Sequence, residues 1–198
     1  YESLLRPHAP YARPPSLPAV ISSRKFFNSN FCFNPQRDLL VFSRCNRAGD
    51  GDLQCALWES RREKKGWSKP QKLPSVINME GYSSLQPFLL SYDNHNVLYF
   101  VSNRPKGYGG LDIWYSISKD GIYNPPVNLG SAINTEGNEV THFYDEKTST
   151  LYFSSDEHIG IDDYDIFYSN GALGTWGEVS NMGVPFNSLY NDFYFAPN

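Results

Sequence analysis

The chain has 198 residues and a net charge of −4, with 19 % charged and 40 % hydrophobic residues. This length suits one globular domain or part of a larger one, and the composition excludes a disordered chain. The negative charge argues against a nucleic-acid partner, and no apolar run approaches the roughly 18 residues that suggest a membrane span.

The first region in chain order, residues 1–27, is rich in proline. Proline disrupts regular elements, so we predict an extended linker here; the prolines are Pro7, Pro10, Pro14, Pro15 and Pro18. Because the chain begins at Tyr1 and shows no signal peptide, we expect a mature product or an excised fragment.

The remaining residues, 28–198, contain an internal repeat of about 55 residues. Each copy has an apolar strand pattern, at residues 39–44, 97–102 and 150–155. An aspartate then opens another strand pattern, and an asparagine lies near the end of the copy. These recurring positions, which we predict to be structural, are Asp52, Asp112, Asp165, Asn78, Asn134 and Asn187.

Short apolar runs alternate with turn residues, which predicts a meander of about four antiparallel strands per copy. In the second copy the strands would lie near residues 86–90, 97–102, 111–117 and 127–129. Stacking such sheets around an axis covers their apolar faces and protects their edges. The sequence therefore predicts an all-β fold, a β-propeller with about three four-stranded blades. The predicted blades are residues 28–82, 83–138 and 139–191, with the start of a fourth at 192–198. Since closed propellers have about 4–8 blades, we expect a partial propeller or a fragment.

The second copy resembles a known repeat through residues 98–104, 110–116 and 129–137. The pattern Leu-Tyr-Phe-x-Ser, a Gly-rich loop and Asp-Ile-Trp-Tyr-Ser resembles the WD40-like β-propeller repeat of the TolB type. The longer period resembles a subgroup found in OmpA-family envelope proteins of Bacteroidetes, including PorE-like proteins of the type IX secretion system.

That resemblance implies a non-catalytic scaffold in the periplasm, associated with the outer membrane. Its partners would be other envelope proteins of a secretion or outer-membrane complex. A lipoprotein anchor and contact with peptidoglycan would come from parts outside this sequence.

Three loops are candidates for protein contacts, because propellers present loops on a rigid scaffold. The candidate residues are Arg61, Arg62, Arg104, Lys106, Tyr108, Glu157, His158 and Asp162. One loop is also acidic, and Asp156, Asp162 and Asp163 are weak candidates for Ca²⁺ ligands, although their spacing does not match an EF-hand. A calcium-stabilised adhesion module is therefore a further alternative.

Cys45 and Cys55 flank a turn and would face each other if their strands pair, so we predict a disulfide there in an oxidising compartment. Cys32 would then be a free thiol. The sequence contains no Cys-x-x-Cys motif, so it predicts no zinc site.

No nucleophile motif or phosphate loop is present, so the sequence predicts no catalytic residues and no cofactor. We expect His142 to be a buried histidine with a hydrogen-bond partner.

The alternative function is a carbohydrate-binding or glycoside-hydrolase-like propeller. Trp58, Trp67, Trp114 and Trp176 would then be sugar platforms, and Asp93, Glu139 and Asp192 could be carboxylates at the axis.

Overall fold

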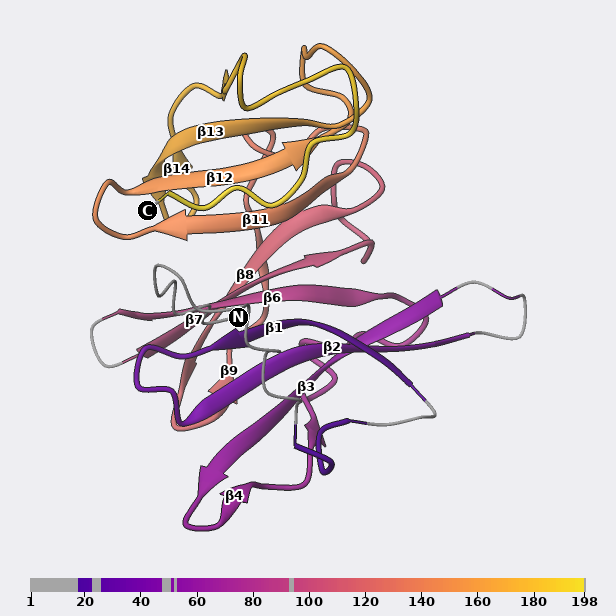
Figure 1. Ribbon diagram of the computed structural model, residues 1–198, viewed down its shortest axis with the longest axis vertical. Helices are drawn as coiled ribbons and strands as arrows, with labels where there is room; N and C mark the ends of the chain where they lie inside the picture. The colour runs from indigo at the N-terminus through magenta and orange to yellow at the C-terminus, as the bar shows by residue number, and fades with distance from the viewer. Residues whose placement is uncertain (1–17, 23–25, 48–50, 52, 93–94, 198) are drawn as a thin grey trace, which may run out of the picture.

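The computed structural model describes residues 18–22, 26–47, 51, 53–92 and 95–197 (Figure 1). Its three antiparallel sheets follow one another along the chain and are the blades of a partial β-propeller, which confirms the predicted fold class. Among the described residues, none belongs to a helix that could cross a membrane. Most of the predicted linker, residues 1–17 and 23–25, lies outside the described residues, as do Asp52 and Asp93.

Each blade has three long strands, and two short strands share its outer edge. Blade 1 contains β1 (Phe27–Phe33), β2 (Leu39–Arg47), β3 (Leu53–Glu63), β4 (Gly66–Trp67) and β5 (Gln71–Lys72). Blade 2 contains β6 (Ser84–Tyr92), β7 (His95–Ser102), β8 (Asp112–Lys119), β9 (Ile122–Tyr123) and β10 (Val127–Asn128). Blade 3 contains β11 (Glu139–Asp145), β12 (Thr150–Ser155), β13 (Asp165–Ala172), β14 (Thr175–Trp176) and β15 (Ser180–Asn181).

The alternation of side chains along the second strand of each blade builds the core. In β7, Leu98 and Phe100 point toward blade 1, whereas Val97, Tyr99 and Val101 point toward blade 3. One strand therefore supplies both inter-blade cores, which explains why these strands are nearly continuous apolar runs.

The inner edge of the propeller is formed by β1, β6 and β11, which pack against one another across the blades. Each of these strands contains a bulge with a residue at positive φ: Asn30 (49°), Gln86 (52°) and Thr141 (51°). A hydrogen bond joins the bulges of blades 2 and 3: the Thr141 amide donates to Gln86 Oε1 at 2.7 Å. The sequence patterns contained no signal for these bulges, since glycine occupies none of the three positions.

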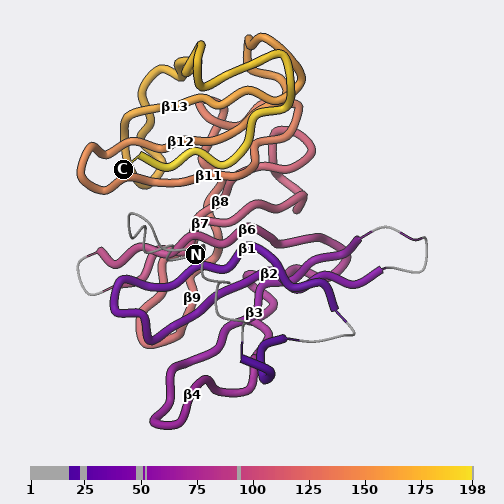
Figure 2. Tube along the Cα trace, in the orientation of Figure 1, coloured from indigo at the N-terminus to yellow at the C-terminus, as the bar shows by residue number. Residues whose placement is uncertain are grey.

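The C-terminal residues continue the pattern beyond blade 3. The Ser154 hydroxyl donates to the carbonyl of Asp192 at 2.9 Å, and Phe195 packs on Tyr152 with ring centroids 4.8 Å apart. Figure 2 shows this yellow segment following β11 and β12. Tyr194, at φ 63°, occupies the position that corresponds to the bulge residues of the complete blades.

A buried asparagine holds the segment that leaves each blade. Asn134 Oδ1 accepts from the Ile113 amide at 2.9 Å, and its Nδ2 donates to the Ile113 carbonyl at 3.0 Å. Asn78 pairs with Leu57 in the same way, and Asn187 with Ile166. The side chain thus replaces a neighbouring backbone at the edge of the third strand, where unpaired peptide groups would be costly.

Cys45 and Cys55 are directly opposed in the register of β2 and β3 and are joined by a disulfide. Cys32 is a free thiol on β1. Burial raises the pKa of Cys32 to about 11, so this thiol stays protonated and unreactive at neutral pH.

We predict that Asn134→Ala lowers the free energy of unfolding by about 2–4 kcal/mol, because it leaves the buried amide and carbonyl of Ile113 unpaired. Urea unfolding followed by tryptophan fluorescence measures this. Asn46→Ala, at an exposed position in β2, is the matched control and should change stability by less than about 0.5 kcal/mol. Equal effects of the two substitutions would contradict the proposed role of the asparagine.

Candidate functional site

A polar groove of about 760 Å³ lies between blades 1 and 2, and we call it the hairpin groove. It opens on the hairpin rim, the edge of the propeller that carries the β1–β2, β6–β7 and β8–β9 hairpins. Its polar side chains come from all three hairpins and from β3: Asn34, Gln36, Asp38, Arg61, Ser91, His95, Asn96, Ser118, Asp120 and Tyr123.

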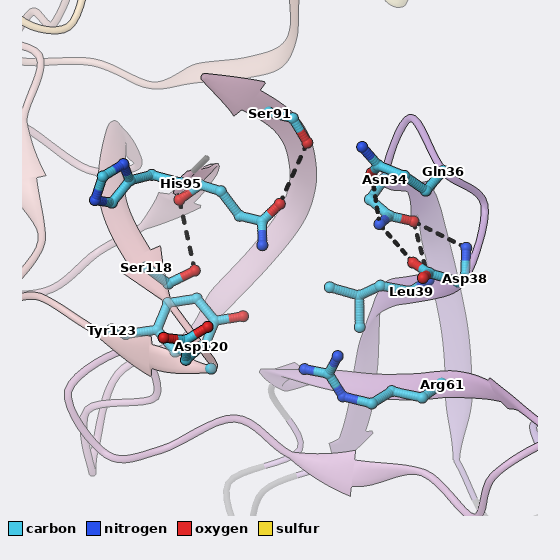
Figure 3. A pocket seen from close by; sticks show the side chains of 12 residues that line it. Asn34, Gln36, Asp38, Leu39, Arg61, Ser91, His95, Ser118, Asp120 and Tyr123 are labelled. Atoms are coloured by element: carbon cyan, nitrogen blue, oxygen red, sulfur yellow. Dashed lines mark hydrogen bonds between the residues drawn. The ribbon is translucent and has the colours of Figure 1, made fainter. Parts of the chain in front are cut away.

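The two sides of the hairpin groove face each other in Figure 3. On the blade 1 side, Asn34 Nδ2 donates to Asp38 Oδ1 at 2.7 Å and to Gln36 Oε1 at 3.0 Å. Asn34 is buried and also accepts from the amides of Asp38 and Leu39, so it fixes the shape of this hairpin. The carboxylate of Asp38 is thereby held in one orientation while remaining exposed.

On the blade 2 side, Asp120 lies in the β8–β9 turn with φ 52°, a conformation that aspartate tolerates better than most residues. Within the described residues its carboxylate makes no hydrogen bond or ion pair. Tyr123 lines the groove beside it, and burial raises the pKa of its phenol, with a further contribution from the Glu59 carboxylate that Arg61 opposes.

Arg61 is the one residue predicted for protein contacts that lines the hairpin groove. Its guanidinium lies 3.4 Å from Glu59, and more than half of its side chain is exposed. The neighbouring Arg62 is exposed and lies over the ring of Trp67.

The other predicted contact residues lie at the opposite ends of the strands, on what we call the loop rim, formed by residues 103–111 and 156–164 and by the segments that connect the blades. Lys106, Tyr108, Glu157 and Asp162 are exposed there. The structure therefore separates the predicted contact residues into two groups on opposite edges.

Arg104 is buried, which corrects its assignment to an exposed contact loop. Its guanidinium donates to the carbonyls of Val76 and Ile77 in the segment from blade 1, and it lies over the rings of Phe100 and Trp114. Burial lowers its pKa to about 10, so it remains charged at neutral pH. Arg104 thus fastens blade 2 to blade 1 and is unavailable to a partner.

His158 has the corresponding position in blade 3. Its Nε2 donates to the carbonyl of Ile133 at 2.9 Å, and its ring packs against Phe153 and Phe167. Sequence reasoning missed this equivalence because arginine and histidine differ, although both can donate to a carbonyl and pack on aromatic rings.

The two repeated aspartates that the structure describes hold the loops before the third strands of blades 2 and 3. Asp112 is buried and accepts from the amides of Tyr108 and Gly109 and from Asn128 Nδ2. Asp165 accepts from the Ile161 amide and from Asn181 Nδ2. These contacts are those of a carboxylate that caps loop amides.

The weak Ca²⁺ candidates are not brought together as a ligand set. Asp156 accepts from the Asn138 amide and side chain at 2.6 and 2.7 Å, while Asp162 and Asp163 are exposed. Among the described residues, no group of three or more histidines, cysteines or carboxylates could hold a metal ion.

The residues that the alternative function singled out and that the structure describes do not meet at one surface. Trp114 is buried in the core between blades 1 and 2, and the other three tryptophans are half-buried. Glu139 is fully buried, where burial raises its pKa, and it accepts from Thr135 and Ser155. Asp192 accepts from the amide and hydroxyl of Ser188.

His142 is buried in blade 3 beside the rings of Phe88 and Tyr99. Neither ring nitrogen has a well-formed hydrogen bond to a described residue, which differs from the expected satisfied histidine. Burial lowers its pKa to about 4, and the nearby backbone of Tyr99 opposes this shift only in part.

Comparison with known proteins gives a fold and no family. No known family model matches the sequence, and no curated protein is significantly similar to it. A solved glycoside hydrolase superposes with a TM-score of 0.54 at 10 % identity, over 87 % of this chain and 61 % of that one. The α-L-arabinofuranosidase Arb93A from Fusarium graminearum superposes with a TM-score of 0.50 at 11 % identity, over 79 % of this chain and 48 % of that one.

These likenesses are to β-propellers, and at such low identity they show the shared fold alone. The chain spans about half the length of the arabinofuranosidase and about three fifths of the length of the other enzyme.

We predict that His142 makes stability depend on pH. Its pKa is lower in the folded chain than the ordinary 6.5, so the unfolded chain binds the extra proton. The free energy of unfolding should therefore fall by up to about 3 kcal/mol as the pH falls from about 6.5 to about 4.

Urea unfolding of the wild-type chain and of His142→Phe across this pH range isolates the effect. Glu139, whose pKa is raised on folding, contributes in the opposite direction, since its contribution is lost as the pH rises through that value. It is present in both chains and cancels in the difference. Parallel plots of the unfolding free energy against pH for the two chains would show that His142 does not cause the predicted pH dependence.

Proposed function

We propose that this chain is a non-catalytic, carbohydrate-binding part of a β-propeller and that its ligand occupies the hairpin groove. The observation that supports this proposal is the composition of the groove lining. The groove lining combines carboxylates, amides and hydroxyls with one arginine and one tyrosine, and these residues come from hairpins of two blades.

Sugar hydroxyls both donate and accept hydrogen bonds, so a site for them needs donors and acceptors in close succession. Asp38 and Asp120 can accept, Arg61 can donate, and the side chains of Gln36 and Asn96 can do both. A ring such as that of Tyr123 can cover the apolar face of a sugar. Similarity in fold to proteins named as glycoside hydrolases is consistent with a carbohydrate ligand.

The positions of the carboxylates favour binding over hydrolysis. Glycoside hydrolysis uses a pair of carboxyl groups, one of which is a general acid in a desolvated environment. Glu139 is desolvated but fully buried and hydrogen-bonded, and it does not line the hairpin groove. Asp38 and Asp120 line the groove but are exposed.

A second candidate is a docking module of a periplasmic, outer-membrane-associated envelope protein. Two features favour it: the Cys45–Cys55 disulfide suits an oxidising compartment, and large apolar side chains are exposed on the loops of blade 3. The side chains are Ile159, Val184, Leu189 and Tyr190. Replacing Leu189 and Tyr190 by serine should abolish capture of envelope partners in this case and leave any glycan binding intact.

For the primary proposal, we expect the full chain to bind members of an array of neutral and acidic oligosaccharides. Asp120→Asn should weaken the best ligand about tenfold or more in isothermal titration calorimetry, because it removes a charged acceptor. Glu178→Gln, an exposed carboxylate outside the groove, is the matched control and should leave the affinity unchanged. Binding to no glycan, or equal affinity of both variants, would count against the hairpin groove as a carbohydrate site.

A further inference from the structure

Residues 18–22 form a turn that recurs at three other places in the described chain, after each of the three blades. The amides of Ile21 and Ser22 both donate to the carbonyl of Pro18, at 2.9 and 3.0 Å. The amides of Ile77 and Asn78 donate in the same way to Pro74. Residues 130–134 repeat the geometry, with Ile133 and Asn134 donating to Gly130, and residues 183–187 repeat it again, with Phe186 and Asn187 donating to Gly183. We call these segments connecting turns.

In the three connecting turns that a described blade follows, this position is a fully buried isoleucine, whereas the turn after blade 3 has the exposed Phe186. Ile21, Ile77 and Ile133 are 56 residues apart in each step and have no exposed surface. Ile77 and Ile133 fill the cores between blades 1 and 2 and between blades 2 and 3. Ile21 instead packs with Leu40 and Phe42 on the face of blade 1 that points away from blade 2.

A side-chain nitrogen of the following blade donates to the isoleucine carbonyl in each of these three turns. Arg44 donates to the Ile21 carbonyl at 3.1 Å, as Arg104 donates to Ile77 and His158 to Ile133. Arg44 also lies over Phe42 and Trp58, which are opposed in the register of β2 and β3. Arg104 lies over the corresponding pair in blade 2, Phe100 and Trp114.

We propose that residues 18–22 are the connecting turn of a further blade of the same repeat. The outward face of blade 1 is then an inter-blade interface that receives this blade. The sequence before the turn agrees with that before the turns after blades 1 and 2, because an aromatic residue stands six positions before a leucine in these three cases. These pairs are Tyr11 and Leu17, Trp67 and Leu73, and Tyr123 and Leu129.

The chemistry of the occupant follows from the blades that are already packed. The outward face of blade 1 carries Leu40 and Phe42, which are already buried together with Ile21, and the half-buried Phe31 and Trp58, so a sheet face that packs there is apolar. A hydrogen bond from Asn30 Nδ2 to Tyr194 Oη at 3.0 Å links the inner edge of blade 1 to the C-terminal segment. This contact brings the C-terminal segment to the inner edge of blade 1.

Hydrogen exchange of the wild-type chain tests the proposal without any substitution. We expect the amides of Ile21 and Ser22 to exchange slowly, in the same class as those of Ile77 and Ile133, because all are held in connecting turns. Exchange of Ile21 and Ser22 at the rate of an unstructured peptide would overturn the proposal. Protection that appears only with dimer formation at high protein concentration would also overturn it, because a second copy would then cover the face.

A double-mutant cycle tests the contact itself. Arg44→Met should lower the melting temperature, and this shift should be clearly smaller in the background of Ile21→Ala, because the turn that Arg44 holds is already loosened. Arg104→Met with Ile77→Ala is the matched cycle in an interface whose blades are both present. Coupling of the same sign in both cycles supports an inter-blade contact, whereas additive shifts for Arg44 and Ile21 alone would overturn it. Neither experiment involves a ligand, so the result is independent of the carbohydrate proposal.

Discussion

The connecting turn is the constraint on which the rest of this structure depends, because it is bound on both sides. Within a blade, a buried asparagine such as Asn134 pairs with the backbone of the third strand. Across the interface, a side-chain nitrogen of the next blade, such as Nε2 of His158, donates to the carbonyl of the preceding isoleucine. One short segment therefore satisfies an exposed strand edge and fixes the angle between two sheets, and both contacts are desolvated, where hydrogen bonds are strong and costly to lose.

This use of the loop rim affects where a ligand can bind. The most conspicuous polar side chains of that rim, including Arg104, Asp112 and Asp165, are committed to loop amides, carbonyls and aromatic rings. On the hairpin rim, turns are held by their own short-range contacts, such as those of Asn34, and neighbouring carboxylates stay exposed. Turns held in this way, with exposed polar groups beside them, suit a binding site, since little conformational entropy is lost when a ligand is bound.

Much of the fold could be predicted from the sequence, whereas little of the candidate site could. Strands such as Val97–Ser102 carry a strong local pattern, and their recurrence identified the propeller. The groove residues Asn34 and Asp120 carried only a turn signal, because a side chain at a hairpin tip has the same local sequence whether or not it faces another blade. The sequence wrongly predicted that Arg104 is an exposed contact residue, because a charged residue in a Gly-rich loop normally faces solvent. Its burial is explained only by its aromatic neighbours on the strands.

The sequence by itself determined the all-β class, the repeat and the positions of the buried strands, because these depend on the period of hydrophobicity and on turn chemistry along the chain. Tertiary structure alone decided which polar residues face each other. Asp38 and Asp120 line one groove although 82 positions separate them. The backbone carbonyl of Ile21 accepts a hydrogen bond from Arg44 of blade 1, and a residue of any type could supply that carbonyl. The physical reason is that inter-blade contacts use backbone groups and inter-sheet geometry, and neither leaves a local pattern in the sequence.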